Sequence, residues 1–194
     1  AEVVVNHKII YPSGVSFYKK VNYFFRVVAD RLPSTFRAQR KIMFSNGTID
    51  NKKVLNEINE SDADLVHLHW VNAAGLSVVD IKKINKPVVL TLHDMWAFTG
   101  GCHYDNGCGG YKSECGKCPL LYSSKEHDLS YKMLNKKRSS FSYNDNLTIV
   151  GGSKWIASAA KESQVFEGVN VIVMPNPINT QFFYPISKEL AKSK

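Results

Sequence analysis

Two adjacent polar residues, His93 and Asp94, follow directly on a short apolar run over 88–92. A run of that length is typical of a strand buried on both faces of a parallel sheet. Ligands gather just outside the carboxyl ends of the strands in open parallel sheets, so these two side chains are placed for chemistry. Histidine is also well suited to proton transfer near neutral pH. We therefore predict that His93 and Asp94 supply a base or orient an acceptor; the alternative is a capped strand end.

Two further imidazoles, His67 and His69, precede Trp70 in a segment over 63–70 that has the pattern of a strand. Alternate residues of a strand point to one face, so His67 and His69 share a face. The end of this strand and the end of the next one would form a common floor. Two histidines without a third ligand nearby in the sequence make a weak metal site. Packing, or a pocket wall made by Trp70, is the favoured interpretation.

All four cysteines of the chain lie in one glycine-rich loop, with the spacing C-x5-C-x6-C-x2-C. Thiolates in such a spacing favour tetrahedral zinc, and a loop with little core of its own would gain from a metal. The alternatives are four reduced thiols or two disulfides. A catalytic zinc is disfavoured because four thiolates leave no open position. We predict a structural zinc bound by Cys102, Cys108, Cys115 and Cys118, with His103 as the substitute ligand.

A second glycine-containing turn, Gly151-Gly152-Ser153-Lys154, lies between an apolar run and a predicted helix. The start of a helix is suited to binding anions. The turn lacks the spacing of a P-loop, and the chain contains no GxGxxG motif.

The elements that would position these residues alternate between strands and helices. Pro33 is expected to end the first helix, and Asp50 and Ser153 are expected to cap later ones. The segment 35–43 is basic and is left open as helix or loop. On the helix that Asp128 begins, we place on the solvent-facing side Lys132, Lys136, Lys137 and Arg138. Predicted strands lie at 3–10, 63–70, 87–92, 147–150 and 169–174, and predicted helices at 17–32, 50–58, 76–84, 128–143 and 154–166. This order predicts a doubly wound parallel α/β sheet.

The net charge of +8 favours an anionic partner: nucleic acid, an acidic membrane surface or a phosphorylated small molecule. No apolar run approaches the roughly 20 residues that span a bilayer. The first residues lack the features of a signal peptide. We therefore expect a reducing, cytoplasmic location, which argues against structural disulfides.

Five segments together resemble the family 4 glycosyltransferases, and more narrowly the bacterial branch that builds capsular, colanic-acid-like and other surface polysaccharides. The resemblance runs from about Asp62 to Pro185. The segments are LVHLHWVNAAGLS, KPVVLTLHDMWAFTGGCHY, CGKCPLL, LTIVGGSKWIASAA and VIVMPNPINTQFFYP.

The resemblance implies one half of a GT-B fold, in which two Rossmann-like domains face each other across a cleft. Residues 1–185 would form the N-terminal, acceptor-side domain without its first βα unit, and 186–194 a tail toward a donor domain that binds the nucleotide-sugar. Such enzymes transfer a sugar with retention of configuration and need no catalytic metal. By this resemblance His93 and Asp94 are the catalytic candidates. The candidate acceptor contacts are His69, Trp70, Trp96, Ser153 and Lys154.

The implied activity is that of a retaining hexosyltransferase acting on a lipid-linked saccharide in capsule or lipopolysaccharide synthesis, peripherally at the inner face of the cytoplasmic membrane. The chain by itself is expected to be inactive, because the family's donor domain and the glycine-rich loop that faces the donor phosphates are not among its segments. The rival interpretation, from another class, is a zinc-stapled basic module that binds nucleic acid. Its basic residues are scattered and are not interleaved with aromatics, which disfavours it.

Overall fold

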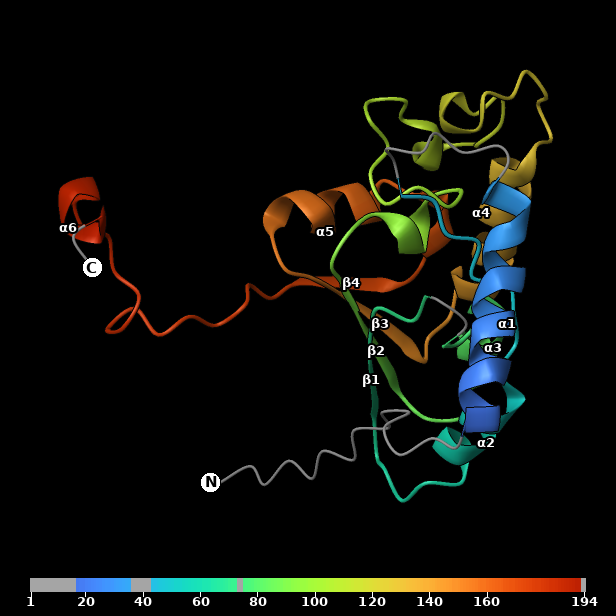
Figure 1. Cartoon of the computed structure of the whole chain (residues 1–194), viewed down its shortest axis with the longest axis horizontal. Coiled ribbons are helices and arrows are strands. Elements are labelled where there is room, and N and C mark those ends of the chain that lie inside the picture. The colour runs from blue at the N-terminus through green and yellow to red at the C-terminus, as the bar shows by residue number, and fades with distance from the viewer. Residues whose placement is uncertain (1–16, 36–42, 73–74, 193–194) are drawn as a thin grey trace.

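The computed structural model describes residues 17–35, 43–72 and 75–192, and its centre is a parallel β-sheet. The four strands of this sheet are β1 (Val66–His69), β2 (Val88–Leu92), β3 (Leu147–Gly151) and β4 (Asn170–Val173). They lie in the order β1-β2-β3-β4, so the chain adds each new strand to the same edge (Figure 1). The predicted α/β class with a parallel sheet is confirmed. In a doubly wound sheet the strand order reverses at one point. The four strands of the described residues show no such reversal. The predicted strand at 3–10 and most of the segment 35–43 lie outside the described residues.

The two faces of the sheet differ in burial. One row that crosses all four strands in register is apolar and buried, and it consists of Leu68, Leu90, Ile149 and Val171. Side chains of alternate residues point to the opposite face, where His67 and His69 are exposed and Thr91 is half-buried. The expectation that β2 is buried on both faces therefore holds for one face only. The half-open face leaves room for polar side chains beside the strand ends.

The helices begin at polar caps. Asp128 caps α4 (Leu129–Phe141) and Ser153 caps α5 (Lys154–Lys161), as predicted. For α2 (Lys52–Asn59) the cap is Asn51, whose side chain accepts from the backbone N–H of Val54; Asp50 instead accepts from the hydroxyl of Ser77. The prediction of an Asp50 cap was therefore wrong by one residue, because the Asp50 carboxylate is used to join α2 to the start of α3 (Val78–Lys82).

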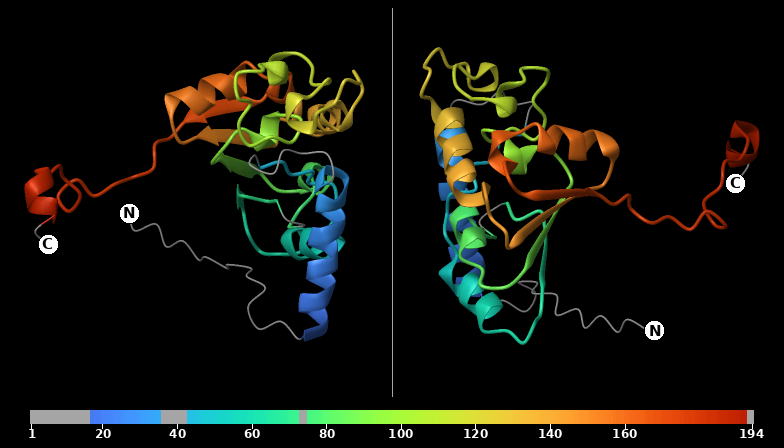
Figure 2. Two further views of the ribbon diagram at one scale, coloured as in Figure 1. Left: turned by 45° about the horizontal axis from the view of Figure 1, so that its top comes forward. Right: turned by 180° about the vertical axis from the view of Figure 1, so that it is seen from behind.

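Two predicted helix ends also shift. The first helix, α1 (Phe17–Thr35), continues past Pro33, and the Ser34 hydroxyl donates to the carbonyl of Arg31 in its last turn. The helix predicted to reach Phe166 ends at Lys161, and a separate short turn, η4 (Gln164–Phe166), follows. Helices α1, α3 and α4 lie together along one side of the sheet (Figures 1 and 2). The chain beyond β4 runs away from this body, and the predicted polar tail contains a short exposed helix, α6 (Lys188–Lys192).

The cysteine-containing loop between β2 and α4 carries three short turns, η1 (Trp96–Phe98), η2 (Gly110–Lys112) and η3 (Pro119–Leu121). It is joined to the segment before α2 by an antiparallel bridge between Phe44 and Cys102. Four of its side chains pack with Phe44 of that segment in a second, smaller buried cluster, and these four are Cys102, Cys118, Leu120 and Leu121. The loop therefore has a small core of its own, contrary to the sequence-based expectation.

Candidate active site

Three imidazoles form a cluster at the carboxyl ends of β1 and β2. We call His67, His69 and His93 the histidine cluster. Nδ1 of His69 lies 2.9 Å from Nε2 of His93, and Nε2 of His67 lies 2.8 Å from the Thr91 hydroxyl. The ring centroids of His67 and His69 are 4.2 Å apart, and those of His69 and His93 are 5.2 Å apart. The pairing of His69 with Thr91 in the parallel register puts His93, two residues later, beside His69.

The surroundings of His67 and His69 favour the neutral forms of these two imidazoles. Partial burial lowers the pKa of His67. Partial burial is also the largest cause of the lowered pKa of His69, and the nearby His67 and His93 lower it further. A neutral imidazole donates with one nitrogen and accepts with the other, so one ring of the His69–His93 pair donates to the other. The bond uses Nε2 of His93, and among the described residues the ring makes no other hydrogen bond. Its Nδ1 is therefore the nitrogen left to a ligand.

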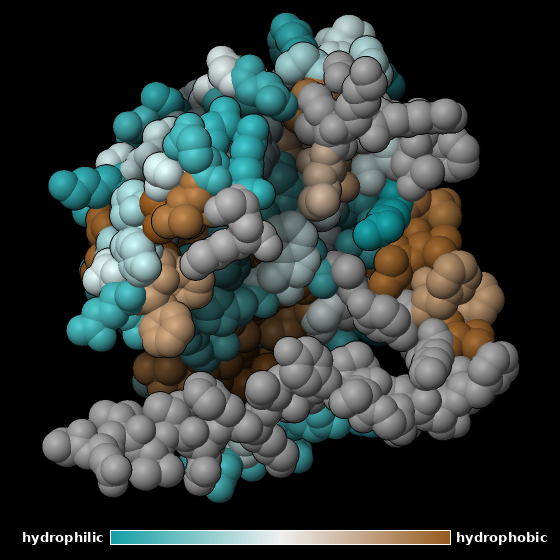
Figure 3. All heavy atoms as spheres, turned by 60° about the vertical axis from the view of Figure 1, so that its left-hand side comes forward, coloured by the Kyte–Doolittle hydropathy of each residue, from teal (hydrophilic) through white to brown (hydrophobic). Residues whose placement is uncertain are grey.

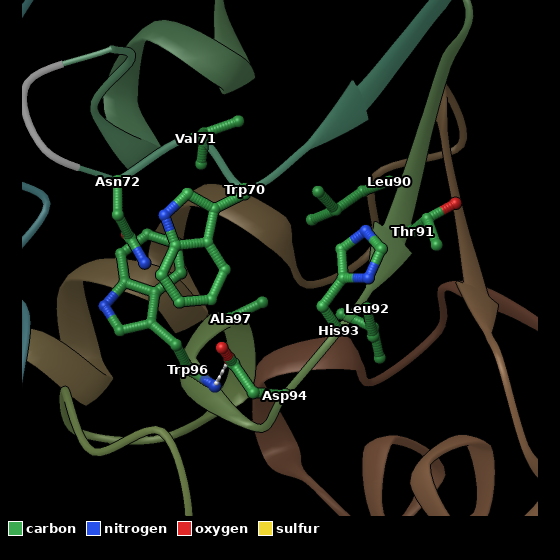
Figure 4. Close-up of a pocket in the computed structure, with 10 residues that line it drawn as sticks. All are labelled: Trp70, Val71, Asn72, Leu90, Thr91, Leu92, His93, Asp94, Trp96 and Ala97. Carbon is green, nitrogen blue, oxygen red and sulfur yellow. Dashed lines mark hydrogen bonds between the residues drawn. The ribbon is translucent and has the colours of Figure 1, made fainter. Parts of the chain in front are cut away.

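The next residue, Asp94, belongs to a different arrangement, which we call the buried network: Asp94, His103 and Ser45. One carboxylate oxygen of Asp94 accepts from the backbone N–H of Trp96 at 2.8 Å (Figure 4). The other lies 2.8 Å from Nδ1 of His103. Nε2 of His103 in turn lies 2.9 Å from the Ser45 hydroxyl. Asp94 is buried, and His103 is only 4% exposed. Both oxygens of Asp94 are thus engaged by the protein itself.

The connectivity of the buried network is that of a Ser-His-Asp triad. Ser45, however, lines neither of the cavities at this site. Its backbone N–H and C=O are also used structurally, by the carbonyl of Gly101 and the indole N–H of Trp96. We therefore interpret the network as structural: it connects the cysteine-containing loop and the segment around Ser45 to the end of β2.

A buried lysine supports the turn that follows Asp94. The ammonium of Lys137 donates to the carbonyls of Trp96 and Thr99 and lies 4.0 Å from the centre of the Trp96 ring. Burial lowers the pKa of Lys137 to about 7, although the nearby Cys102, Cys115 and Asp94 act in the opposite direction. The prediction that Lys137 faces solvent was therefore wrong. Its position, three residues after Leu134 and four before Phe141, is on the buried stripe of α4.

A cavity of about 440 Å³ opens beside these groups. Trp70, half exposed and in the left-handed region with φ 44°, lines it together with His93. A much smaller cavity of about 20 Å³ lies between the ends of β1 and β2 and the η1 turn, and Figure 4 shows its lining. The residues that line the larger cavity are Met43, Trp70, His93, Asp94, His103, Tyr104 and Asn106.

Four of the predicted site residues meet here: His69, Trp70, His93 and Asp94. Trp96, 4% exposed and fixed by its indole N–H, lines the smaller cavity and not the larger one. Ser153 and Lys154 are exposed at the start of α5 and line neither cavity. A Cβ at Gly151 would lie 2.8 Å from that of Ala157, so this glycine allows α5 to pack closely on the strand end.

Sequence reasoning missed three contributors to the site. His103 was considered only as a substitute metal ligand, Tyr104 was not considered, and Lys137 was placed on the wrong face. The helical spacing of Leu134, Lys137 and Phe141 was a usable signal for the lysine. No pattern in the sequence paired His103 with Asp94, because that contact depends on how the loop returns to the strand.

The four cysteines are free, and their surroundings differ. Cys102 and Cys118 are buried in the smaller cluster, Cys115 packs against the main core, and Cys108 is exposed. Burial raises the pKa of Cys102 to about 11 and that of Cys115 to about 12, so both are protonated at neutral pH. Among the described residues no group of three His, Cys, Asp or Glu side chains is placed to hold a metal ion. In this structure the thiols do not fit the predicted zinc site.

The fold and site together define a parallel α/β domain with a ligand cavity at the carboxyl ends of its strands, which is where such domains bind their substrates. The profile of Glycosyltransferase Family 4 matches residues 8–182, and the chain belongs to that family. The domain is accordingly one Rossmann-like half of the GT-B type, and enzymes of this family need no catalytic cofactor.

A curated relative supports the same assignment. Over 83 residues the chain is 35% identical to the putative colanic acid biosynthesis glycosyl transferase WcaC of Escherichia coli (strain K12). The matched segment is 40% of this chain and 20% of the relative, so the chain spans only a small part of that protein. No solved structure matches the chain. None of the described helices combines the length and the apolar character that crossing a bilayer requires. The zinc-stapled nucleic-acid module finds no support in the fold or in these matches.

Proposed function

We propose that this chain is the acceptor-side domain of a retaining hexosyltransferase, which transfers a sugar from a nucleotide-sugar to a lipid-linked saccharide during surface-polysaccharide synthesis. The observation that carries the proposal is the position of His93. Its exposed ring lies at the end of β2, is oriented by His69 at 2.9 Å, and borders the cavity of about 440 Å³. The relative's role in colanic acid biosynthesis supports the class of product.

In this proposal the histidine cluster acts on the acceptor hydroxyl. His93, with Nε2 bonded to His69, offers Nδ1 to a hydroxyl or to the transferred sugar and so fixes its orientation. Asp94 holds the turn after β2 in place through Trp96 and His103, and it is not free to serve as a second acid or base. The nucleotide-sugar would be bound mainly by a second domain, which also supplies most of the stabilisation of the leaving nucleotide.

The lipid-linked acceptor and the membrane location are supported by charge. The net charge of +8 suits an anionic, membrane-bound substrate at the cytoplasmic face. The face seen in Figure 3 mixes hydrophilic side chains with smaller hydrophobic patches, which fits peripheral contact.

A transfer assay tests the proposal. Radiolabelled nucleotide-sugars are offered, with polyprenyl-diphosphate-linked saccharides as acceptors, to the purified 194-residue chain and to the two-domain enzyme that contains it. We expect transfer by the two-domain enzyme and none by the chain alone. Turnover by the isolated chain, or none by either protein with any donor, contradicts the proposal.

The structural zinc remains a separate proposal for the cysteine loop, supported by the spacing of the four thiols and not by their placement. It requires the four sulfur atoms to converge on one ion, an arrangement that no three of the described His, Cys, Asp or Glu side chains make in this structure. Elemental analysis of protein purified without added metal or chelator tests it. One zinc per chain supports the site, and four freely titratable thiols without zinc or iron exclude it.

A further inference from the structure

Two exposed aromatic side chains from distant parts of the chain stack on each other, and one of them, Tyr104, lines the larger cavity. Tyr104 comes from the cysteine loop and Trp155 from the first turn of α5. Their ring centroids are 6.3 Å apart with an interplanar angle of 25°. Tyr104 is 53% exposed and Trp155 57% exposed. Large aromatic surfaces left open to solvent beside a cavity are typical of recognition sites.

The base of this pair is rigid. Tyr104 directly follows His103, whose two ring nitrogens are both engaged in the buried network and whose backbone N–H and C=O bond to Met43 and Met95. Trp155 directly follows the cap and first residue of α5. A rigid aromatic pair presents contact area without a large loss of side-chain entropy on binding.

A third aromatic side chain, Trp70, lines the same cavity as Tyr104. Its backbone has φ 44°, which is unfavourable for a bulky residue, and its ring centroid lies 5.1 Å from that of His103. The ring remains 50% exposed. Local strain that keeps a tryptophan at a cavity border fits a role in ligand binding.

The polar groups of the cavity indicate a neutral ligand. Of the described residues that line it, none is a lysine or an arginine, and its one carboxylate, Asp94, is occupied by Trp96 and His103. Among the described residues of this lining, a diphosphate would meet no lysine or arginine to balance its charge. The imidazole of His93 and the amide of Asn106 can instead bind hydroxyls. Aromatic faces with a few hydrogen-bonding side chains suit a pyranose ring, which has an apolar C–H face and a rim of hydroxyls.

We propose that Trp70 and Tyr104, with Trp155 supporting Tyr104, form a subsite for an uncharged sugar unit of the acceptor, and that the lipid diphosphate binds outside this cavity. The inference rests on the proposed transferase function and adds the residues and the chemical class of the group that is bound. It gives the cysteine loop a role in choosing the acceptor.

Binding measurements on the 194-residue chain test the subsite without requiring turnover. Saturation-transfer NMR and tryptophan fluorescence are recorded with methyl glucopyranoside, methyl galactopyranoside, neutral disaccharides of the same sugars, methyl glucuronide, UDP and GDP. We expect a neutral saccharide to bind. The variants Tyr104→Ala and Trp155→Ala should weaken its binding about fivefold or more.

The conservative variants Tyr104→Phe and Trp155→Phe keep the stack, so they should bind within a factor of about two of the original chain. Tyr122→Ala, which removes a more exposed aromatic of the same loop that does not line the cavity, should behave likewise. The phenylalanine variants also report whether a loss in the alanine variants comes from the ring or from misfolding.

Three results would overturn the subsite: no binding of any neutral saccharide at millimolar concentration, binding that the alanine variants leave unchanged, or UDP or GDP binding that depends on Tyr104 and Trp155. Saccharide binding with the expected variant pattern, but no transfer by the two-domain enzyme, would instead support the subsite and contradict the proposed function.

Discussion

The histidine cluster and the buried network begin at neighbouring residues, yet they lie in opposite environments. His93 turns toward the half-open face of the sheet and meets His69, whereas Asp94 turns inward and meets His103. Both arrangements use imidazoles at hydrogen-bonding distance. In the first, His93 keeps a nitrogen for a ligand; in the second, both nitrogens of His103 are engaged. A histidine–aspartate pair in sequence is therefore not one structural unit here: His93 lines the larger cavity, and Asp94 holds the turn after β2 through Trp96 and His103.

The largest effect is expected from removing the imidazole that lines the larger cavity. In the two-domain enzyme, His93→Ala should lower turnover by about a hundredfold or more, as loss of a positioned polar group at the reacting centre does. Because His93 is exposed, the melting temperature should stay close to that of the unmodified enzyme. Steady-state kinetics and thermal unfolding measure the two quantities. His127→Ala, which removes another exposed imidazole, is the control. Activity of His93→Ala within a factor of about two would make His93 a structural cap.

The buried imidazole should give the opposite pattern. His103→Ala leaves the Asp94 carboxylate buried with one oxygen unpaired, and we expect a loss of about 2–3 kcal/mol in the free energy of unfolding. Urea denaturation of the 194-residue chain measures it, again with His127→Ala as the matched control. Equal stability of His103→Ala and His127→Ala would show that the buried network does not stabilise the fold. The proposed difference in role between His103 and His93 would then be contradicted.

The sequence was sufficient for the sheet because each strand and each crossover helix has a local apolar pattern. The helix caps at Asp128 and Ser153 and the site residues at the strand ends followed from the same local information. The half-open face could not be predicted in this way, because it depends on where the chain places each strand relative to the last. The contacts of His103, and the stacking of Tyr104 on Trp155, depend on the path of a long loop, for which no periodicity exists. Lys137 was missed for another reason: its charge was given more weight than its helical spacing.

A pH titration sharpens the role of the buried lysine below the network. The pKa of Lys137 is about 7 in the folded chain, below its ordinary value of 10.5, so between these values the unfolded chain holds more protons. Stability should therefore rise with pH in this window, by about 1–2 kcal/mol from pH 7 to pH 8.5.

Urea denaturation of the 194-residue chain at several pH values measures this slope, and Lys137→Met should remove it. Lys132→Met, on the exposed side of the same helix, should retain it. Burial raises the pKa of Cys102, Cys115 and Cys118 above the ordinary value of 9.0, so these thiols lower stability as pH approaches 9.0 and oppose the rise only at the top of the window. Identical slopes in the unmodified chain and in Lys137→Met would contradict the assignment.

The smallest effect is expected at the exposed thiol of Cys108. Its size distinguishes a cysteine loop stabilised by packing alone from one stabilised by a bound metal ion. Cys108→Ser removes a solvent-exposed side chain, so the free energy of unfolding should change by no more than about 0.5 kcal/mol if packing alone holds the loop. Cys118→Ser places a hydroxyl in the smaller apolar cluster and should cost about 1–3 kcal/mol. A closed four-thiolate zinc site predicts otherwise, because every ligand would then matter and both variants would lower the melting temperature and release the ion. Thermal unfolding of the two variants, with and without a chelator, separates the cases. The metal site is supported if Cys108→Ser and Cys118→Ser lower the melting temperature equally and the chelator removes their difference from the unmodified chain. The four thiols would then bind a metal in the folded protein and would not be free.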